Sequence, residues 1–143
     1  MFQTYCKDWE VLPEFEMEFI SIFKGWLGLE NLHKLDEVTE QEWGKFNILL
    51  ELVSEQHELH VVDYETESCS LISDVNLILE SYSMSMEKDA SRFTTLIIPE
   101  LDCVLSEDWD YTYILWHKNK TAVKALEPLI HKAGLFHFCD EST

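Results

Sequence analysis

Apolar side chains recur at helical spacing near the start of the chain. The spacing predicts an amphipathic helix over residues 13–28, because Pro13 suits a first helical turn and Gly28 suits a left-handed cap. Acidic residues just after Pro13 favour a helix N-terminus electrostatically. The apolar stripe of this predicted helix consists of Phe15, Phe19, Ile22, Phe23 and Trp26.

Two further helices are predicted in the same part of the chain. One begins at Thr39, because residues 39–42 match a capping box. The other spans about residues 70–84. Between them, residues 57–64 fit either an extension of the second helix or a short strand. The apolar stripe of the helix after Thr39 consists of Trp43, Phe46, Leu50 and Val53, with Leu49 beside it.

The pattern changes near residue 92, where apolar residues come in short runs and alternating positions rather than at helical spacing. Runs of this kind, rich in β-branched and aromatic residues, predict strands. Asn119 can cap a following helix, in which Pro128 should cause a kink. We expect strands at 93–98, 101–105, 111–116 and 135–138, a turn at 106–110 and a helix at 120–133.

These elements predict an α+β fold with a small, mainly antiparallel sheet of three to four strands packed against amphipathic helices. The helix before the last strand can make a crossover, which would allow one parallel pair. Glycine and proline are few, with four and three residues, and no linker composition occurs, so we expect one domain over residues 1–143. Residues 1–91 should be mainly helical and acidic, and residues 92–143 should hold strands plus one helix.

The charge changes the functional picture more than any motif does. The chain has 28 Asp and Glu against 10 Lys and Arg, a formal charge of −18, which argues against binding to nucleic-acid phosphates. Residues 1–91 hold 20 acids and 5 bases, whereas residues 92–143 hold 8 and 5. Such a field either only solubilises the protein or attracts a basic protein partner, as in inhibitors of nucleases. Candidate contact residues on the predicted helical face are Glu14, Glu18 and Glu51.

A second acidic group lies in the predicted turn at 106–110. Glu107, Asp108 and Asp110 surround Trp109, and carboxylates so close together can hold a divalent cation or act as an acid and base pair. The spacing does not match an EF-hand loop. A solvated turn is the more common reading, and an exposed Trp surrounded by acids is typical of an interface anchor.

Histidines offer only weak metal or catalytic motifs. His57 and His60 would share a helix face with Asp63, but the spacing is not His-Glu-x-x-His, so we expect no stoichiometric zinc and no cofactor. His131 and His137 lie near Cys139, as nucleophilic cysteine catalysis requires, but packing in the core explains this arrangement better. We therefore expect a non-enzymatic protein.

The remaining features concern the compartment. Cys6, Cys69, Cys103 and Cys139 form no Cys-x-x-Cys pair, and the N-terminus has no secretory signal pattern, which predicts reduced, mostly buried thiols in the cytoplasm. No run of about 18 apolar residues occurs, so we expect no membrane span.

The last third of the chain carries a family resemblance, in residues 98–105, 109–116 and 125–135. These segments, about 45 residues in all, resemble small bacterial proteins of unknown function, including mobile integron gene-cassette products and immunity-like families. The resemblance implies a compact cytoplasmic α+β accessory protein, often a homo-oligomer, without an assigned activity.

Two functions therefore remain open. The first is a non-enzymatic acidic binding protein, of an immunity or inhibitor type, that engages a basic protein partner. The alternative is a small-ligand binding protein or enzyme with an aromatic pocket between sheet and helices. The aromatic residues expected at that pocket are Trp26, Trp43, Tyr113 and Trp116.

Overall fold

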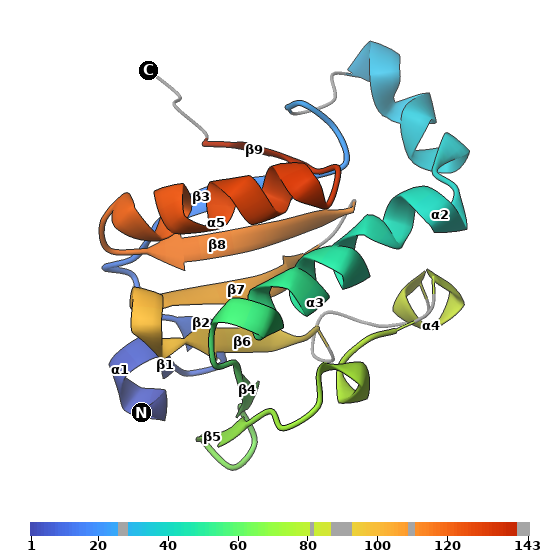
Figure 1. Cartoon of the computed structure of the whole chain (residues 1–143). Helices are drawn as coiled ribbons and strands as arrows, with labels where there is room; N and C mark the ends of the chain where they lie inside the picture. The colour runs from blue at the N-terminus through green and yellow to red at the C-terminus, as the bar shows by residue number, and fades with distance from the viewer. Residues whose placement is uncertain (26–28, 81, 87–92, 109–110, 140–143) are drawn as a thin grey trace.

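A seven-stranded sheet forms the centre of the molecule. The computed structural model describes residues 1–143 apart from 26–28, 81, 87–92, 109–110 and 140–143 (Figure 1). The sheet order is β5-β4-β6-β7-β8-β3-β9, and all neighbouring strands are antiparallel. Its strands are β3 (Glu16–Ser21), β4 (His60–Asp63), β5 (Ser68–Leu71), β6 (Thr95–Ile98), β7 (Cys103–Asp108), β8 (Thr112–His117) and β9 (Phe136–Phe138).

The fold is α+β, but the predicted small sheet is wrong. Seven strands replace the expected three to four, and no neighbouring pair among the sheet's described strands is parallel. Three of the strands, β3, β4 and β5, come from the part of the chain that was expected to be mainly helical. The change of period near residue 92 therefore marks no boundary between a helical part and a sheet.

The predicted helix over 13–28 is wrong, because this segment supplies strand β3. β3 lies inside the sheet, between β8 and β9. Residues 14–19 alternate between Glu and apolar residues, a period that fits a strand, while the same apolar residues also recur at helical spacing. Pairing with two distant strands decides between the two patterns. Trp26 and Gly28 lie outside the described residues.

The helix predicted from Thr39 is confirmed. The Thr39 hydroxyl accepts a hydrogen bond from the Glu42 backbone N–H, and the Thr39 backbone N–H donates to the Glu42 carboxylate, which completes the capping box. Helix α2 (Glu40–Trp43) follows this cap and leads into α3 (Lys45–Gln56). The side chains of its predicted apolar stripe are all buried, namely Trp43, Phe46, Leu50 and Val53, and so is Leu49 beside it.

Residues 57–84 settle one open alternative and correct one prediction. The strand alternative for 57–64 is right, because β4 occupies part of that segment. The helix over 70–84 is wrong, because the segment begins inside β5, which pairs with β4. Leu71, predicted on the apolar face of this helix, is 58% exposed. Other short helices are η1 (Leu29–Glu37), η2 (Val75–Leu77), α4 (Tyr82–Met86) and η4 (Pro99–Leu101).

The C-terminal elements agree with the sequence in kind. β7 extends through Asp108, so residues 106–108 of the predicted turn belong to the strand. Helix α5 (Thr121–Lys132) begins where the Asn119 side chain accepts a hydrogen bond from the Thr121 N–H, and it accommodates Pro128 internally. Gly134 ends it with φ +86°, a conformation that favours glycine.

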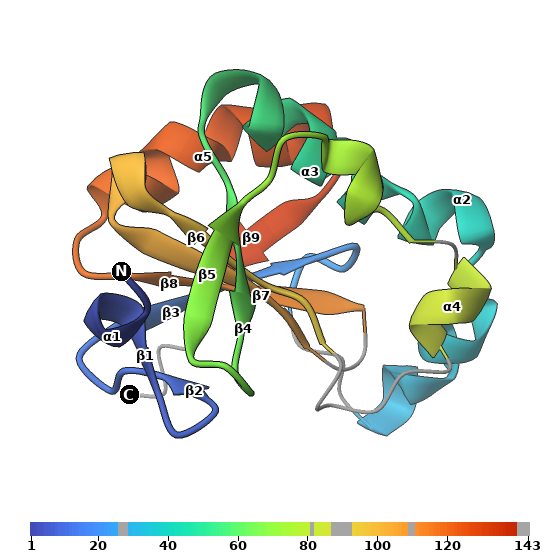
Figure 2. The ribbon, with the colours of Figure 1, turned by 90° about the horizontal axis from the view of Figure 1, so that it is seen from below.

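The two faces of the sheet carry separate cores. Helices α3 and α5 cover one face, and α1 (Phe2–Tyr5) with the hairpin of β1 (Cys6–Lys7) and β2 (Glu10–Val11) lies on the other (Figure 2). We call these the helix face and the open face. The helix-face core is large and includes Leu105 and Leu115. The core of the open face is smaller, and its buried residues are Phe2, Tyr5, Cys6, Phe15, Ile97 and Val104.

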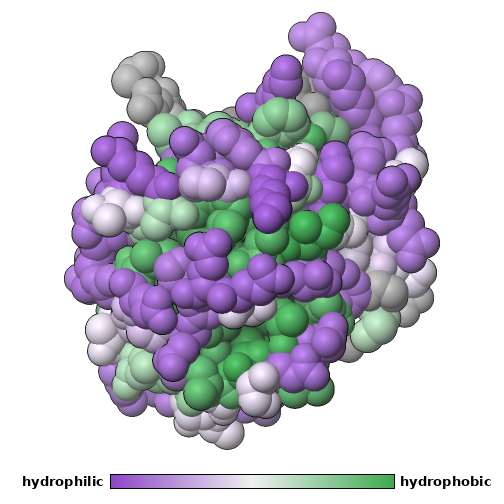
Figure 3. All heavy atoms as spheres, in the orientation of Figure 1, coloured by the Kyte–Doolittle hydropathy of each residue, from purple (hydrophilic) through white to green (hydrophobic). Residues whose placement is uncertain are grey.

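Much of the outer surface is hydrophilic. In the view of Figure 3, the projecting part formed by η1 and α2 is almost wholly hydrophilic, and hydrophobic side chains show mainly over the body of the sheet and its two long helices. Within the described residues, no helix combines the length and the apolar character needed to cross a membrane.

Candidate functional site

A groove on the open face is lined by both aromatic and acidic residues. Its volume is about 690 Å³. The hairpin β1–β2 forms one wall, and strands β6, β7 and β8 form the floor. We call it the sheet groove; its aromatic lining residues are Trp9, Tyr64, Phe93 and Trp116.

Trp9 forms the exposed edge of the groove. Cys6 pairs with Val11 and Lys7 with Glu10, so Asp8 and Trp9 make a two-residue hairpin turn. Both have positive φ, 53° and 65°, as a type I′ turn requires. Asn-Gly usually occupies this turn, because a bulky residue there costs roughly 1–2 kcal/mol. The turn therefore stores strain at the residue that borders the groove, an arrangement that is frequent at functional sites.

A stack of aromatic rings holds Trp9 in place. Its ring stacks on that of Tyr64 with centroids 5.4 Å apart and planes inclined by 23°. Phe2 contacts Tyr64 edge-on at 6.0 Å. Burial raises the pKa of Tyr64 to about 12, so its hydroxyl is neutral at ordinary pH. Trp9 itself remains 52% exposed, so it can contact a bound partner.

The floor of the groove is fixed by a polar contact. The Trp116 indole N–H donates a hydrogen bond to the Ser106 hydroxyl over 2.9 Å. The two residues lie on the neighbouring strands β8 and β7, and both line the groove. The contact holds the Trp116 ring in one orientation before any ligand arrives.

The charged lining is acidic. A second cavity of about 470 Å³ adjoins the groove and shares Trp9, Tyr64 and Phe93 with it. Among the described residues that line the two cavities, every charged residue is acidic, and the Glu107 side chain lies on the helix-face side of β7 with that of its pair Tyr113. These acids are Glu10, Asp63, Glu65, Glu80, Glu107 and Asp108.

The acids predicted on one helical face do not share one. Glu14 precedes β3 and lies 3.6 Å from the Lys118 ammonium. Glu18 lies on β3, is 8% exposed and contacts His137. Glu51 alone is an exposed helical acid, on α3. The predicted shared face was wrong because it required a helix over residues 13–28, and that segment contains strand β3 instead.

The acids predicted in the turn are placed at the end of β7. Glu107 is 9% exposed, and its carboxylate accepts a hydrogen bond from the Thr94 backbone N–H. Asp108 is partly exposed and lines the sheet groove. Trp109 and Asp110, predicted as an interface anchor and its acidic neighbour, lie outside the described residues.

His57, His60 and Asp63 do not converge on one point. His57 Nδ1 lies 2.9 Å from Glu100 Oε2, and His60 Nε2 lies 3.8 Å from Glu58 Oε2. Asp63 instead accepts hydrogen bonds from backbone N–H groups of the following turn. The hydrogen bond to His57 holds the pKa of Glu100 below its usual value.

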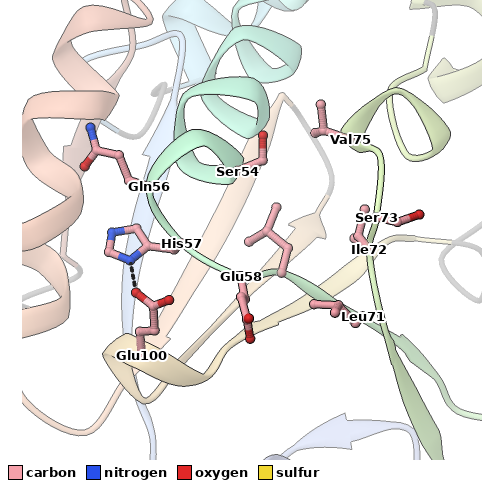
Figure 4. Close-up of a pocket in the computed structure, with 10 residues that line it drawn as sticks. Ser54, Gln56, His57, Glu58, Leu71, Ile72, Ser73, Val75 and Glu100 are labelled. Carbon is pink, nitrogen blue, oxygen red and sulfur yellow. Dashed lines mark hydrogen bonds and ion pairs between the residues drawn. The ribbon is translucent and has the colours of Figure 1, made fainter.

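The cavity beside His57 has a volume of about 380 Å³ (Figure 4). It contains two serines, but their hydroxyls point away from the imidazole, which faces Glu100. The Ser54 hydroxyl donates to the Glu51 carbonyl. This histidine and carboxylate therefore have no aligned serine nucleophile among the described residues that line the cavity.

His137 lies between two carboxylates. Its Nδ1 is 2.6 Å from Glu18 Oε2, and its Nε2 is 2.8 Å from Glu127 Oε2. Burial lowers the pKa of His137, but the hydrogen bonds to both carboxylates and their charges raise it, and the net pKa is above the usual value. The His131 ring stacks against the His137 ring, with centroids 5.8 Å apart.

Cys139 is exposed rather than packed in the core, so the predicted core packing is wrong for this thiol.

The described aromatic residues expected at a pocket between sheet and helices do not lie together. Trp43 and Tyr113 are 6% and 7% exposed and belong to the helix-face core, where Tyr113 stacks on Phe46 at 4.9 Å. Trp116 lies on the opposite face, in the sheet groove.

The sequence analysis did not identify Trp9 and Tyr64 as site residues. Nothing in their local sequence indicates that they stack, because 54 residues lie between them.

None of the four cysteines, all of which lie within the described residues, forms a disulfide. Cys6 and Cys103 are buried, Cys69 is partly buried and Cys139 is exposed. Burial raises the pKa of Cys103 to about 12 and also raises that of Cys6, so both are poor nucleophiles in the folded protein.

Comparison with known proteins gives no relative. No protein-family model matches the chain, and no curated protein or solved structure matches it significantly. The resemblance of the last third to integron cassette products stays a prediction.

Proposed function

We propose that this protein is a non-enzymatic, cytoplasmic binding protein of an inhibitor or immunity type, and that it engages a basic protein partner through the sheet groove. The observation that carries the proposal is the combination of an exposed Trp9 with a lining whose described charges are all negative. A Lys or Arg side chain of the partner would enter this groove.

Aromatic rings supply the first part of the affinity. A cation within about 6 Å of a ring centroid is attracted by its electron-rich face, with roughly 0.5–2 kcal/mol gained as water is excluded. Trp9 and Tyr64 present a prearranged stack, and Trp116 is already oriented by Ser106. Little side-chain entropy is therefore lost when a partner binds.

Carboxylates supply selectivity and fast association. Glu10, Asp63 and Glu65 are exposed at the rim of the two cavities. Rim charges of one sign steer an oppositely charged partner and repel an acidic one. The overall charge of −18 acts in the same direction at longer range.

The test is titration of the isotope-labelled protein with an oligolysine peptide, followed by NMR. We expect the indole N–H signals of Trp9 and Trp116 to shift and that of Trp43, buried on the helix face, to stay in place. An oligoglutamate peptide of equal length should cause no shift. Binding should weaken when salt shortens the Debye length from about 30 Å at 0.01 M to about 8 Å at 0.15 M.

A matched pair of double variants separates the groove from general acidity. Glu10→Gln with Glu65→Gln should weaken peptide binding about tenfold, the sum of two rim contacts of about 0.7 kcal/mol each. Glu51→Gln with Glu55→Gln removes the same charge from α3 and should leave binding unchanged. Equal losses in both variants would mean that the acidity acts only as a diffuse field, and the groove proposal would then be wrong.

A small cationic ligand is the second candidate, because the groove volume of about 690 Å³ is in the range of small-molecule sites. A monovalent organic cation, such as an alkylated ammonium, would then bind as tightly as the peptide. Competition between the two probes for the Trp9 signal distinguishes these functions.

A further inference from the structure

Three potential metal ligands meet where α5, β9 and β3 come together. Glu127 and His131 are four residues apart on α5 and so lie on the same side of that helix. His137 reaches the same point from β9. One ligand atom from each of the three residues lies within 4.8 Å of the other two.

We propose that Glu127, His131 and His137 bind a divalent transition-metal ion such as zinc. Two imidazoles and one carboxylate are a ligand set that zinc accepts, at distances of about 2.0–2.2 Å. Tetrahedral ligands at such distances are about 3.4 Å apart, so small side-chain rotations suffice. Glu127 and His131 are exposed, so their side chains can make these rotations. Three protein ligands leave one position for water.

Glu18 orients the central ligand. Its buried carboxylate lies 2.6 Å from His137 Nδ1, which holds the ring so that Nε2 faces Glu127. Histidine ligands of metals usually donate their other ring N–H to such a carboxylate, and this contact fixes the tautomer. The role of orienting His137 therefore explains why a carboxylate, Glu18, is buried on strand β3.

The ion would join parts of the chain that otherwise have few contacts. β9 has three residues and pairs only with β3 within the described sheet. Coordination would add a metal bridge between β9 and α5 to the 2.8 Å contact between His137 Nε2 and Glu127 Oε2 and the stacked His131 and His137 rings. A bound ion therefore stabilises this edge of the sheet.

This site differs from the one considered in the sequence. The expectation of no stoichiometric zinc was based on His57 and His60, which contact Glu100 and Glu58 instead. His137 and Glu18 are 119 residues apart, so their contact could not be expected from spacing.

The test is calorimetric titration of the chelator-treated full chain with zinc chloride, together with the visible absorption of added Co²⁺. We expect one ion per chain, and an increase in melting temperature with zinc concentration because the ion binds the folded state. Cobalt bound to imidazole and carboxylate ligands should give d–d bands that zinc then removes.

Variants assign the ion to this site. His131→Ala and Glu127→Gln alter exposed side chains of α5, so they should fold normally and weaken zinc binding at least tenfold. Glu18→Gln should weaken it about 10–100-fold, the range for loss of a carboxylate that orients a ligand. His57→Ala is the matched control and should bind zinc as the unaltered protein does. Absence of binding, or unchanged affinity in His131→Ala and Glu127→Gln, would overturn the proposal.

Discussion

The helix face and the open face of the sheet use the same strands for different purposes. On β8, Leu115 is fully buried under α3 and α5, whereas its neighbour Ile114 is partly exposed in the sheet groove. The β1–β2 hairpin and α1 cover only part of the open face, so a cavity remains beside them. Alternate residues of one strand thus contribute to stability on one face and to recognition on the other.

The largest expected effect comes from testing those two neighbours. Leu115→Ala should lower the free energy of unfolding by about 2–5 kcal/mol, because it opens a cavity in a packed core. Ile114→Ala should cost about 1 kcal/mol, because the partly exposed site loses less apolar burial. Urea denaturation of both variants measures the difference. Similar losses would show that the open face is packed as tightly as the helix face.

Alkaline pH should affect the tyrosines of the two faces in sequence. On the open face, burial together with the hydrogen bond to Asp102 raises the pKa of Tyr5 to about 12, and burial raises that of Tyr64 to about 12. Complete burial raises the pKa of Tyr113, on the helix face, still further. Unfolded tyrosines ionise near pH 10, so this stability is present below pH 10 and is lost as pH rises towards 12.

Absorbance at about 295 nm, where tyrosinate absorbs, should therefore report the ionisation of Tyr5, Tyr64 and Tyr113 only well above pH 10, together with loss of the circular dichroism signal. Reversible ionisation of all five near pH 10, with the fold intact, would contradict the burial described for both faces.

Trp9→Gly should change stability little while impairing the groove. Glycine removes the cost of a positive φ, roughly 1–2 kcal/mol, and the loss of the stack on Tyr64 costs about 0.5–1.5 kcal/mol. The net change in the free energy of unfolding should be within about 1 kcal/mol, although the residue is a tryptophan. Thermal unfolding measures the change in stability, and oligolysine titration measures binding to the groove. A large loss of stability would make Trp9 a structural residue.

Thiol labelling gives the smallest perturbation, because it leaves the sequence unchanged. At pH 8 an aromatic disulfide reagent should react with Cys139 at once, because this thiol is exposed. Cys6, in the small core of the open face, should react before Cys103, because a small core opens at lower free energy. Mass spectrometry of labelled peptides gives the order of labelling. Labelling of Cys103 before Cys6 would mean that the helix-face core opens at lower free energy than the core of the open face.

The sequence predicts well those elements that depend on neighbouring residues. The capping box at Thr39 and the stripe of α3 need only local contacts, and both are found. β3 could not be predicted, because its alternating and helical patterns coexist and only pairing with β8, about a hundred residues later, selects the strand. The groove and the Glu18–His137 contact likewise join distant segments.

The position of β3 between β8 and β9 also sets an order for folding. Strands β6, β7 and β8 are consecutive and antiparallel, so each can pair with the one before it across a short loop. β3 must close a far longer loop to reach β8, and β9 has no partner in the sheet until β3 has docked. β3 precedes the other strands of this sheet in the chain, yet it is among the last to join the sheet. Until β3 pairs with β8, its apolar residues stay exposed and can form non-native contacts.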